Sequence, residues 1–363
     1  MTVRSELPKT RRLVVKIGSR TIANDAAFPA RLAKQIAELA GQKCGSVVVT
    51  SGAIALGWGR LGYKAKPKEV ALLQASAAAG QSVLMRRYDE AFGELGITPA
   101  QVLLSYADLA DRERLNNARE ALGALLEAGA VPIVNENDTV ATEEIRFGDN
   151  DQLAAMVVPL VGADLLVLLT DVEGVLDATG QRIPVMSADA QMVVLEAKSD
   201  RMGSGGMGSK VDAARKASRS GAAVVIAPAG HPNVLNEIVA GADVGTLFPR
   251  LGPPLKARKH WIAFTLRPKG TLLLDAGAVR AMREGKSSLL PIGVSGVSGD
   301  FNAGDAVRLC SVDGVEVARG LTRLGTVDVA RAAGRKGAEL EASFGAAAAE
   351  LVVVHKDDLV VSG

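Results

Sequence analysis

LVVKIGS, residues 13–19, is the stretch that decides how this chain folds. Residues 13–17 have the apolar character of a buried strand, and Gly18 and Ser19 let the chain turn directly behind it. Lys16 interrupts the apolar run where the strand ends, and burying an ammonium group there has a desolvation cost. Such a lysine needs an anionic partner, and a bound phosphate would serve. The alternative is a lysine that reaches water from an edge strand.

Five further short runs rich in Val, Leu and Ile predict buried strands at residues 46–50, 101–104, 131–135, 165–170 and 223–226. Segments with helical spacing lie between them, at residues 29–41, 68–93, 112–128, 151–161 and 211–220. This alternation predicts an α/β fold with a mainly parallel open sheet and helices on both faces. Ligands of such sheets bind at the carboxyl ends of the strands. We therefore expect one edge of the sheet to collect Lys16, Ser51, Asn135 and Asp171.

The second half of the chain has a different pattern. The alternation ends near residues 246–248, and residues 249–259 (PRLGPPLKARK) have the composition of a linker. Short alternating runs at residues 271–275, 289–294, 306–312, 315–324 and 351–355 then predict a small, mostly β domain with one or two short helices, one of them at 277–284. Asp313 and Gly314 indicate a hairpin turn. A chain of 363 residues exceeds the size of a single core, so we expect two domains, residues 1–255 and 256–363.

Composition limits the classes of partner. The chain has 42 basic and 40 acidic residues, a net charge of +2, which provides no general attraction for nucleic acid or anionic lipid. Residues 256–363 contain 15 basic and 12 acidic residues, only a faint basic excess. The two cysteines and three histidines are scattered, which argues against disulfides and zinc. No apolar run reaches the roughly 18 residues of a membrane helix. We therefore expect a cytoplasmic protein without a membrane segment.

Residues 203–210, GSGGMGSK, form a glycine-rich stretch that ends in Lys210. Gly203 and Gly208 have the separation of a P-loop, but Ser209 and Lys210 stand in the reverse order, so this is not a Walker A motif. Glycines still let backbone N–H groups approach phosphate oxygens, and the predicted helix that follows adds its positive end. The stretch favours phosphate binding over the alternative of a flexible surface loop.

Two short polar blocks, NEND at 135–138 and GDND at 148–151, place acids and amides on both sides of a hairpin-like segment at 143–147. Helix capping explains one of these residues, not all of them. Short carboxylates and amides can hold an ammonium group, orient lysines or bind Mg²⁺. Ser51 can cap a helix or lie beside an anion. Thr170 and Asp171 end a strand, where a turn or a nucleotide contact would explain them.

None of these motifs contains a histidine that could act as a general base, and no Cys-His or Ser-His-Asp arrangement stands out. A carboxylate acceptor needs no base, because free Asp and Glu side chains titrate near pKa ~4. Phosphoryl transfer then depends on positioning and on cations that neutralise the transferring oxygens. Two lysines and Mg²⁺ would supply these cations, so the residues indicate phosphoryl transfer from a nucleotide to a small substrate.

Together these motifs resemble the amino acid kinase superfamily, and within it the glutamate 5-kinase family. The matching segments are VVKIGS (14–19), VVVTSGAIALG (47–57), DRERLNNAR (111–119), PIVNENDTVATEEIRFGDND (132–151), LLTDVEG (168–174) and SGGMGSK (204–210). Beyond the linker, GTLF (245–248), RKHWI (258–262) and KSSLLPIGV (286–294) are similar to the PUA domain fused to these kinases.

The resemblance implies ATP-dependent phosphorylation of the γ-carboxylate of L-glutamate to L-glutamyl 5-phosphate, the first step of proline biosynthesis, with Mg²⁺ and with proline as feedback inhibitor. We also expect a homo-oligomer. By motif position the catalytic residues would be Lys16, Lys210 and Asp151, with Asp151 orienting the two lysines. Glutamate would be held by Ser51, Asp138, Asn150 and Asn135. The residues in contact with ATP would be Lys16, Thr170, Asp171, Ser204, Gly205, Gly206, Met207, Gly208, Ser209 and Lys210.

Two alternatives stay open at this level. One is another kinase of the superfamily that acts on N-acetylglutamate, aspartate, carbamate or a nucleoside monophosphate. The other is an RNA-binding role of the C-terminal domain. Asp138 suits a substrate with a free ammonium group, since an N-acetylated substrate would leave the carboxylate unpaired. Residues 175–180 (VLDATG) depart from the Leu-Tyr-x-x-Asp-Pro pattern of the family, so contacts to the nucleotide base are not carried over.

Overall fold

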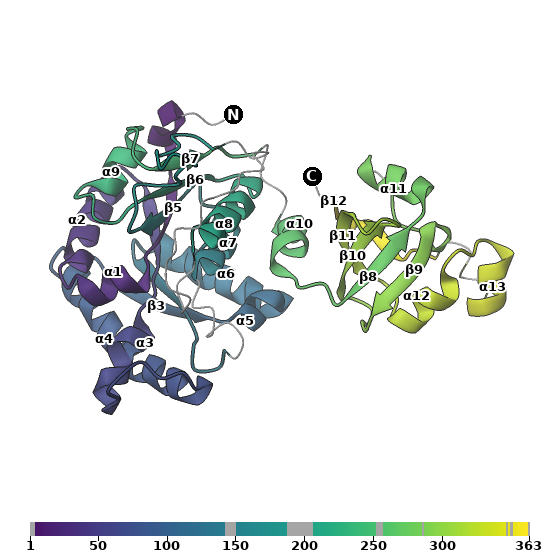
Figure 1. Ribbon diagram of the computed structural model, residues 1–363, viewed down its shortest axis with the longest axis horizontal. Coiled ribbons are helices and arrows are strands. Elements are labelled where there is room, and N and C mark those ends of the chain that lie inside the picture. Colours follow the sequence, from purple (N-terminus) through teal and green to yellow (C-terminus); the bar gives the residue numbers. More distant parts are fainter. Residues whose placement is uncertain are drawn as a thin grey trace. The chain divides into compact units, whose positions relative to one another are not determined.

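The computed structural model describes residues 4–141, 150–186, 206–251, 257–284, 287–345, 348 and 351–361. The chain divides into two compact units, Met1–Pro254 and Leu255–Gly363. Each unit is built on a β-sheet of its own (Figure 1). None of the described helices is long and apolar enough to cross a lipid bilayer.

The sheet of the first unit has seven strands. Across the sheet they are β3 (Pro99–Leu104), β4 (Val131–Glu136), β2 (Gly45–Val49), β1 (Arg12–Lys16), β5 (Leu165–Thr170), β6 (Ala223–Pro228) and β7 (Thr246–Phe248). All neighbours are parallel except β6 and β7, which are antiparallel. The mainly parallel sheet is therefore confirmed, and the six predicted strands all form with ends within two residues of the prediction. Strand β7 was not predicted.

Helices cover both faces of this sheet, as the alternating pattern predicts (Figure 1). Helices α2, α4 and α9 pack on one face, and α6, α7 and α8 pack on the other. The helices of the unit are α1 (Ser19–Asn24), α2 (Phe28–Gly41), α3 (Ala53–Gly57), α4 (Val70–Gly93), α5 (Tyr106–Ala110), α6 (Arg112–Glu127), α7 (Asn150–Val161), α8 (Met207–Arg219) and α9 (Val234–Val239). The described part of the unit also has two short 3₁₀ segments, Arg4–Lys9 and Trp58–Leu61.

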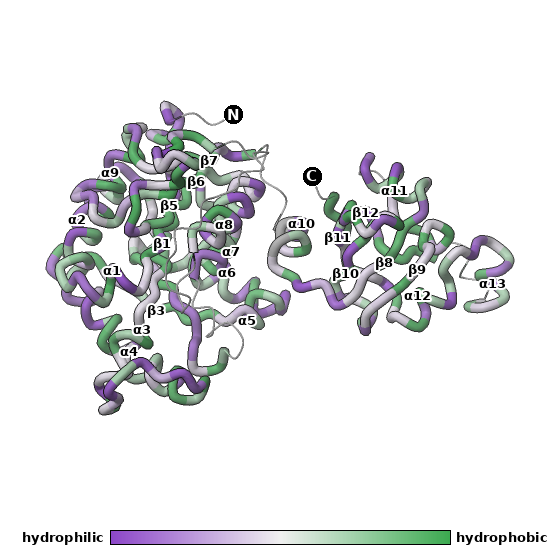
Figure 2. Tube along the Cα trace, viewed as in Figure 1, coloured by the Kyte–Doolittle hydropathy of each residue, from purple (hydrophilic) through white to green (hydrophobic). Residues whose placement is uncertain are grey.

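The alternation of side chains along β1 decides where Lys16 points. Leu13, Val15 and Ile17 are fully buried in the core formed with α2, α4 and α9. Because successive side chains of a strand point to opposite faces, Lys16 points to the face covered by α7 and α8. The hydrophobic residues of the unit are concentrated on the central strands, with mixed polarity on the surrounding helices (Figure 2). Lys16 is thus a cation placed within an apolar layer.

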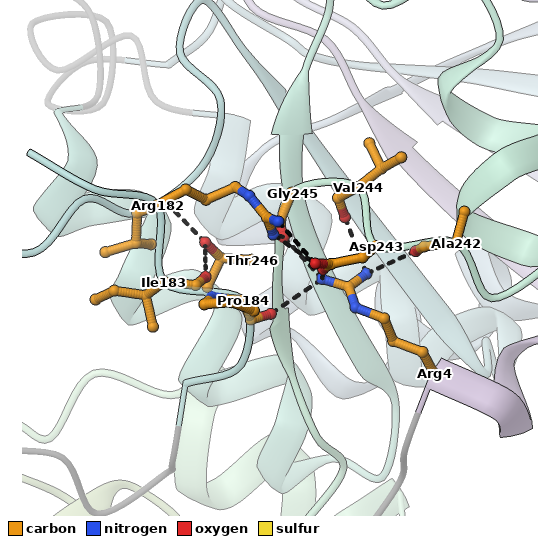
Figure 3. A network of polar contacts seen from close by, with 10 residues as sticks. Arg4, Arg182, Ile183, Pro184, Ala242, Asp243, Val244, Gly245 and Thr246 are labelled. Carbon is orange, nitrogen blue, oxygen red and sulfur yellow. Dashed lines mark hydrogen bonds and ion pairs between the residues drawn. The ribbon is translucent and has the colours of Figure 1, made fainter.

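The guanidinium group of Arg4 lies where three segments of the first unit meet (Figure 3). It forms an ion pair with Asp243 at 3.0 Å, and Arg182 pairs with the same carboxylate at 2.9 Å. The hydrogen bond from Arg182 holds the pKa of Asp243 below its ordinary value. Arg4 also donates, at 2.8 to 3.0 Å, to the carbonyl oxygens of Pro184, Ala242, Val244 and Gly245. One side chain therefore ties the N-terminal segment to the stretch after β5 and to the turn before β7.

The second unit has a five-stranded sheet. Across it the strands are β12 (Val354–Val361), β11 (Glu316–Thr322), β10 (Ala306–Ser311), β8 (Gly270–Leu274) and β9 (Val294–Gly299), with only β8 and β10 parallel. Its helices are α10 (Ala257–His260), α11 (Ala276–Arg283), α12 (Thr326–Ala332) and α13 (Ala338–Phe344), with a π-helical turn at Trp261–Thr265. The mostly β character is as predicted, and Gly314, at φ 80°, turns the chain between β10 and β11.

Three predictions for the second unit need correction. The predicted strand at 289–294 is a 3₁₀ turn, Pro291–Gly293, followed by β9, because a proline has no N–H group for a sheet ladder. The last strand starts later than predicted, at Val354. The unit also holds more helix than the one or two short ones expected. Part of the predicted linker lies outside the described residues, and α10 begins inside its last part.

Candidate active site

Four neighbouring strands, β4, β2, β1 and β5, end at the same edge of the first sheet. Lys16 is the last residue of β1, Ser51 follows β2, Asn135 lies at the end of β4, and Thr170 ends β5. Helix α7 begins at this edge, with Asn150 and Asp151 in its first turn. Parallel strands that end together place sequence-distant side chains in one region, where α/β sheets bind their ligands.

A buried ion cluster joins three of the predicted residues. The Lys16 ammonium lies 2.6 Å from Oδ1 of Asp151, and the Lys210 ammonium lies 3.0 Å from Oδ2 of the same carboxylate. The Asp151 side chain is fully buried, and those of Lys16 and Lys210 are 5% and 11% exposed. Strand β1, helix α7 and helix α8 each contribute one of the three groups. Asp151 thus sets the positions of both cations.

The charge of this cluster points to an anionic ligand. Two ammonium groups meet at one carboxylate in this cluster, and an anionic ligand would further stabilise buried cations. Lysine is a flexible point charge that binds phosphate oxygens well. The arrangement is therefore suited to a phosphoryl group between Lys16 and Lys210.

Beside the ion cluster runs a chain of amide side chains. The Asn150 Nδ2 group donates to the backbone carbonyl of Thr50 at 2.5 Å and to Asn135 Oδ1 at 2.8 Å. Asn135 Nδ2 in turn donates to Gln81 Oε1 at 2.9 Å. Asn135 and Asn150 are both buried. The amides at the end of β4 and at the start of α7 are therefore held in one hydrogen-bonded row next to Asp151.

Ser51 does not cap a helix, contrary to the capping alternative. Helix α3 begins at Ala53, and the residue before it is Gly52, in the left-handed conformation at φ 109°. The buried Ser51 hydroxyl makes no hydrogen bond within the described part of the chain. A buried hydroxyl without a partner has an energetic cost, which a ligand would remove. Ser51 is thus placed to contact a ligand.

Comparison with known proteins identifies the family. Residues 11–228 match the amino acid kinase family, and residues 270–344 match the PUA domain. The chain belongs to the amino acid kinase family. Nearly its whole length is similar to curated proteins named glutamate 5-kinase. The protein from Trichlorobacter lovleyi is 42% identical, covering 99% of this chain and 98% of the relative. The protein from Thermus thermophilus is 44% identical, covering 97% of this chain and 97% of the relative. The protein from Chromohalobacter salexigens is 43% identical, covering 99% of this chain and 98% of the relative.

Asp138 of this kinase lies in the turn that follows β4. The residue is half-buried, and burial raises the pKa of its carboxyl to about 6, while the charge of Lys66 acts in the opposite direction. The turn is held to helix α4 by Gln74, whose Nε2 donates to the carbonyl of Ala141 at 3.0 Å. A carboxyl whose ionised form is poorly solvated gains from a cationic ligand, such as an ammonium group.

Thr170 and Asp171 lie at the other side of the site, at the end of β5. The Thr170 hydroxyl donates to the Asp171 carboxylate at 3.2 Å, and Arg20 of α1 pairs with that carboxylate at 2.6 Å. Both members of this ion pair are more than half exposed. Asp171 is therefore accessible at the same edge as Lys16, and Arg20 is an additional cation that sequence reasoning did not single out.

The glycine-rich stretch is described only from Gly206 onward, so Ser204 and Gly205 lie outside the described residues. Gly206 is extended and precedes helix α8, which begins at Met207. The predicted helix start at residue 211 is therefore too late. Met207, Gly208, Ser209 and Lys210 form the first turn of α8, because a single glycine there is not enough to prevent a helix. The segment 142–149, with the predicted hairpin-like stretch, also lies outside the described residues.

Helix α4 supplies two residues that sequence reasoning missed. Gln81 accepts from Asn135, and the buried Tyr88 hydroxyl lies 2.8 Å from Thr50 Oγ1. Burial raises the pKa of Tyr88 far above its usual value. The two residues are seven positions apart, two helical turns, and so share one face of the helix. This spacing is the only sequence signal, and it is as typical of a core helix as of a site.

The carboxylates of the described residues do not form a site for Mg²⁺. These residues contain no group of three or more His, Cys, Asp or Glu side chains that could hold a metal ion. Asp151, the most buried carboxylate of the site, has both oxygens turned to lysine ammonium groups. Asp151 in this arrangement therefore does not fit a magnesium ligand.

Proposed function

We propose that this kinase transfers the γ-phosphoryl group of ATP to the γ-carboxylate of L-glutamate. The products are ADP and L-glutamyl 5-phosphate, and the reaction is the first step of proline biosynthesis. The observation that carries the proposal is the buried cluster in which Asp151 holds Lys16 and Lys210 at its two oxygens. The full-length similarity to proteins named glutamate 5-kinase supports the choice of substrate.

In this proposal the reaction needs no general base. A glutamate γ-carboxylate is ionised at neutral pH and attacks the γ-phosphorus directly, while the bond from phosphorus to the β,γ-bridging oxygen breaks and ADP leaves. Lys16 and Lys210 neutralise the charge on the transferring phosphoryl oxygens, and Asp151 keeps their ammonium groups in place. Mg²⁺ enters with the nucleotide, as MgATP, and is bound mainly by phosphate oxygens.

Substrate binding is divided between the two sides of the Lys16 strand. On the side of β2 and β4, glutamate is held by Ser51, Asn135, Asp138 and Asn150. On the side of β5 and α8, ATP contacts Thr170, Asp171 and the glycine-rich stretch from 204 to 210. The unpartnered Ser51 hydroxyl supports the first assignment, and the exposed Asp171 carboxylate at the edge of the sheet supports the second.

The wider expectations from the resemblance belong to the same proposal. We assign residues 1–255 to the kinase domain and 256–363 to the PUA-like domain, whose boundary lies close to the division between the two compact units. Proline is the expected feedback inhibitor, and the enzyme is expected to act in the cytoplasm as a homo-oligomer.

The proposal is tested by incubating the purified protein with MgATP, hydroxylamine and one candidate acceptor at a time. Hydroxylamine converts an acyl phosphate to a coloured hydroxamate. L-Glutamate should give hydroxamate and ADP in equal amounts, while N-acetylglutamate, L-aspartate and carbamate should give neither above background. Hydroxamate from N-acetylglutamate but not from glutamate would assign the enzyme to a different branch of the family.

A further inference from the structure

The hydrogen bonds in the row of amide side chains all run in one direction from donor to acceptor, and a backbone carbonyl sets this direction. The carbonyl oxygen of Thr50 can only accept a hydrogen bond, so the Asn150 amide must present its NH₂ group to it. The same NH₂ group donates to Asn135 Oδ1, so Asn135 must present its oxygen to Asn150. The Asn135 NH₂ group then faces Gln81 and requires an acceptor there. The Thr50 carbonyl thus determines which atom is oxygen and which is nitrogen in the amides of Asn150, Asn135 and Gln81.

The far end of the chain reaches a less buried side chain. Gln81 Oε1 accepts from Asn135, and Gln81 Nε2 donates to Gln101 Oε1 at 3.0 Å. Gln101 lies on β3 and is exposed, so it can turn its amide or bond to water instead. Asn135 is only 2% exposed and has no such freedom. Gln81 is therefore the residue that satisfies the buried end of the row.

Helix α4 holds Gln81 rigidly against the strands of the site. Tyr88, on the same helix face, is 2.8 Å from Thr50 Oγ1, so α4 also secures the residue whose carbonyl starts the row. A Cβ atom added to Gly80 would lie 1.8 Å from the carbonyl oxygen of Ala53, the first residue of α3. The backbones of α3 and α4 are thus in direct contact one residue from Gln81. The contact between α3 and α4 fixes where Gln81 lies, and the hydrogen bond from Asn135 fixes how its amide is oriented.

We propose that Gln81 is a positioning residue, which accepts from Asn135 and so holds the Asn135 and Asn150 amides in the orientation that the Thr50 carbonyl sets. With both N–H bonds of its amide used, Asn150 offers a ligand only its carbonyl oxygen. A carbonyl oxygen accepts from an ammonium group and cannot donate to a carboxylate. Gln81 thus acts through Asn135 to present an acceptor to the α-ammonium group of the substrate. This inference rests on the proposed glutamate phosphorylation.

The test replaces Gln81 in the full-length enzyme by methionine, which has a similar shape but no acceptor oxygen, and by glutamate, which keeps it. Gln81→Met should raise the KM for glutamate about tenfold, equivalent to about 1.4 kcal/mol, with the KM for ATP within twofold of wild type. Gln81→Glu should recover most of this loss. Gln101→Met, at the exposed end of the row, is the matched control and should change neither KM.

A double-mutant cycle shows whether Gln81 acts through Asn135. Gln81→Met should have little further effect on the glutamate KM in an Asn135→Ala background. If the effects of the two substitutions multiply, or if Gln81→Met raises the KM for ATP and for glutamate alike, the inference is wrong. An unchanged glutamate KM in Gln81→Met also overturns it. Thermal melts report folding, and Gln81→Ala replaces the methionine variant should that one be unstable.

These results are separable from a failure of the proposed function. If the wild-type enzyme forms no glutamyl hydroxamate, the proposed function is wrong, and the role of Gln81 that rests on it is wrong as well. An active wild type with an unaffected Gln81→Met variant removes only the role of Gln81.

Discussion

The ammonium group of Lys16 lies 2.6 Å from the buried carboxylate of Asp151, joining the end of β1 to the first turn of α7. A second lysine, Lys210, binds the other oxygen of that carboxylate from α8. The relationship explains how a lysine is tolerated in an apolar strand: its charge is neutralised within the fold. It also places two ammonium groups at one carboxylate, where an anionic ligand would be stabilised.

Replacing Lys16 by methionine should reduce kcat by about 10²–10³-fold, the usual effect of removing one group that stabilises charge in a transition state. The KM for glutamate should change little, because the proposed mechanism places Lys16 beside the transferring phosphoryl group and not beside glutamate. Steady-state assays in which the concentrations of glutamate and ATP are varied separate the effect on kcat from the effect on each KM. A variant whose only defect is a raised glutamate KM would place Lys16 in substrate binding instead.

Asp151→Asn should be more harmful to folding than the loss of either lysine. The substitution removes the carboxylate that two buried ammonium groups share, and removal of one partner from a buried ion pair costs about 3–5 kcal/mol. Urea denaturation of Asp151→Asn, with Lys16→Met as the control, measures the difference. Equal stability of the two variants would mean that the cluster is better solvated than its burial indicates.

The carboxyl of Asp138 should give glutamate binding a dependence on pH. Its pKa in the free enzyme is raised to about 6, so kcat/KM for glutamate should fall as the pH drops through 6 and the carboxylate becomes protonated. Asp138→Asn should lose this inflection and weaken glutamate more than ATP. Weakening of both substrates by the same factor would indicate a structural role.

The raised pKa of Asp138 also affects stability, but ionisation of this carboxyl favours glutamate binding and destabilises the folded state. Because folding raises this pKa above its unfolded value, the folded state binds the proton more tightly, and ionising Asp138 as the pH rises from about 4 to 6 costs stability. Asp138→Asn should therefore unfold at a higher urea concentration than wild type at pH 7.5, and the difference should shrink toward pH 4. A variant less stable than wild type at pH 7.5 contradicts this.

Arg4 should contribute to stability through its four carbonyl partners and Asp243 (Figure 3). Arg4→Ala should lower the free energy of unfolding of the first unit by about 2 kcal/mol, since hydrogen bonds of a charged, partly buried group are worth more than neutral ones. Arg250→Ala, which removes an exposed pair with Glu6, is the control and should cost less than about 0.5 kcal/mol. Similar losses for both would show that burial of Arg4 is unimportant.

Close packing of α3 on α4 gives a test with two glycines of one helix. Gly80→Ala would place a methyl group 1.8 Å from a backbone oxygen and should cost about 3 kcal/mol, displacing Ser51 as α3 moves. Gly93 has open space around its Cα, so Gly93→Ala should leave stability unchanged or raise it by up to about 1 kcal/mol. Thermal melts together with the glutamate KM report both effects.

Much of the site could be predicted because parallel strands end at a common edge. The apolar runs located β1, β2, β4 and β5, and strand order then brought Lys16, Ser51 and Asn135 together. The alternative of Ser51 as a helix cap does not hold, because Gly52 takes the position before the helix. The role of Gln81 could not be predicted, since a glutamine on a long helix has no periodic signal that distinguishes a half-buried acceptor from a surface residue. Its partner becomes known only when α4 is packed against the sheet.

The role of the two lysines in phosphoryl transfer can be measured by comparing wild type with Lys210→Met in one assay, in which glutamyl hydroxamate and ADP are formed from L-glutamate and MgATP in the presence of hydroxylamine. We expect equal amounts of both products from wild type and a loss of about 10³-fold or more in the variant, with its thermal melt close to that of wild type, because Asp151 keeps Lys16 as its partner. Transfer by folded Lys210→Met at a rate within tenfold of wild type would contradict this role.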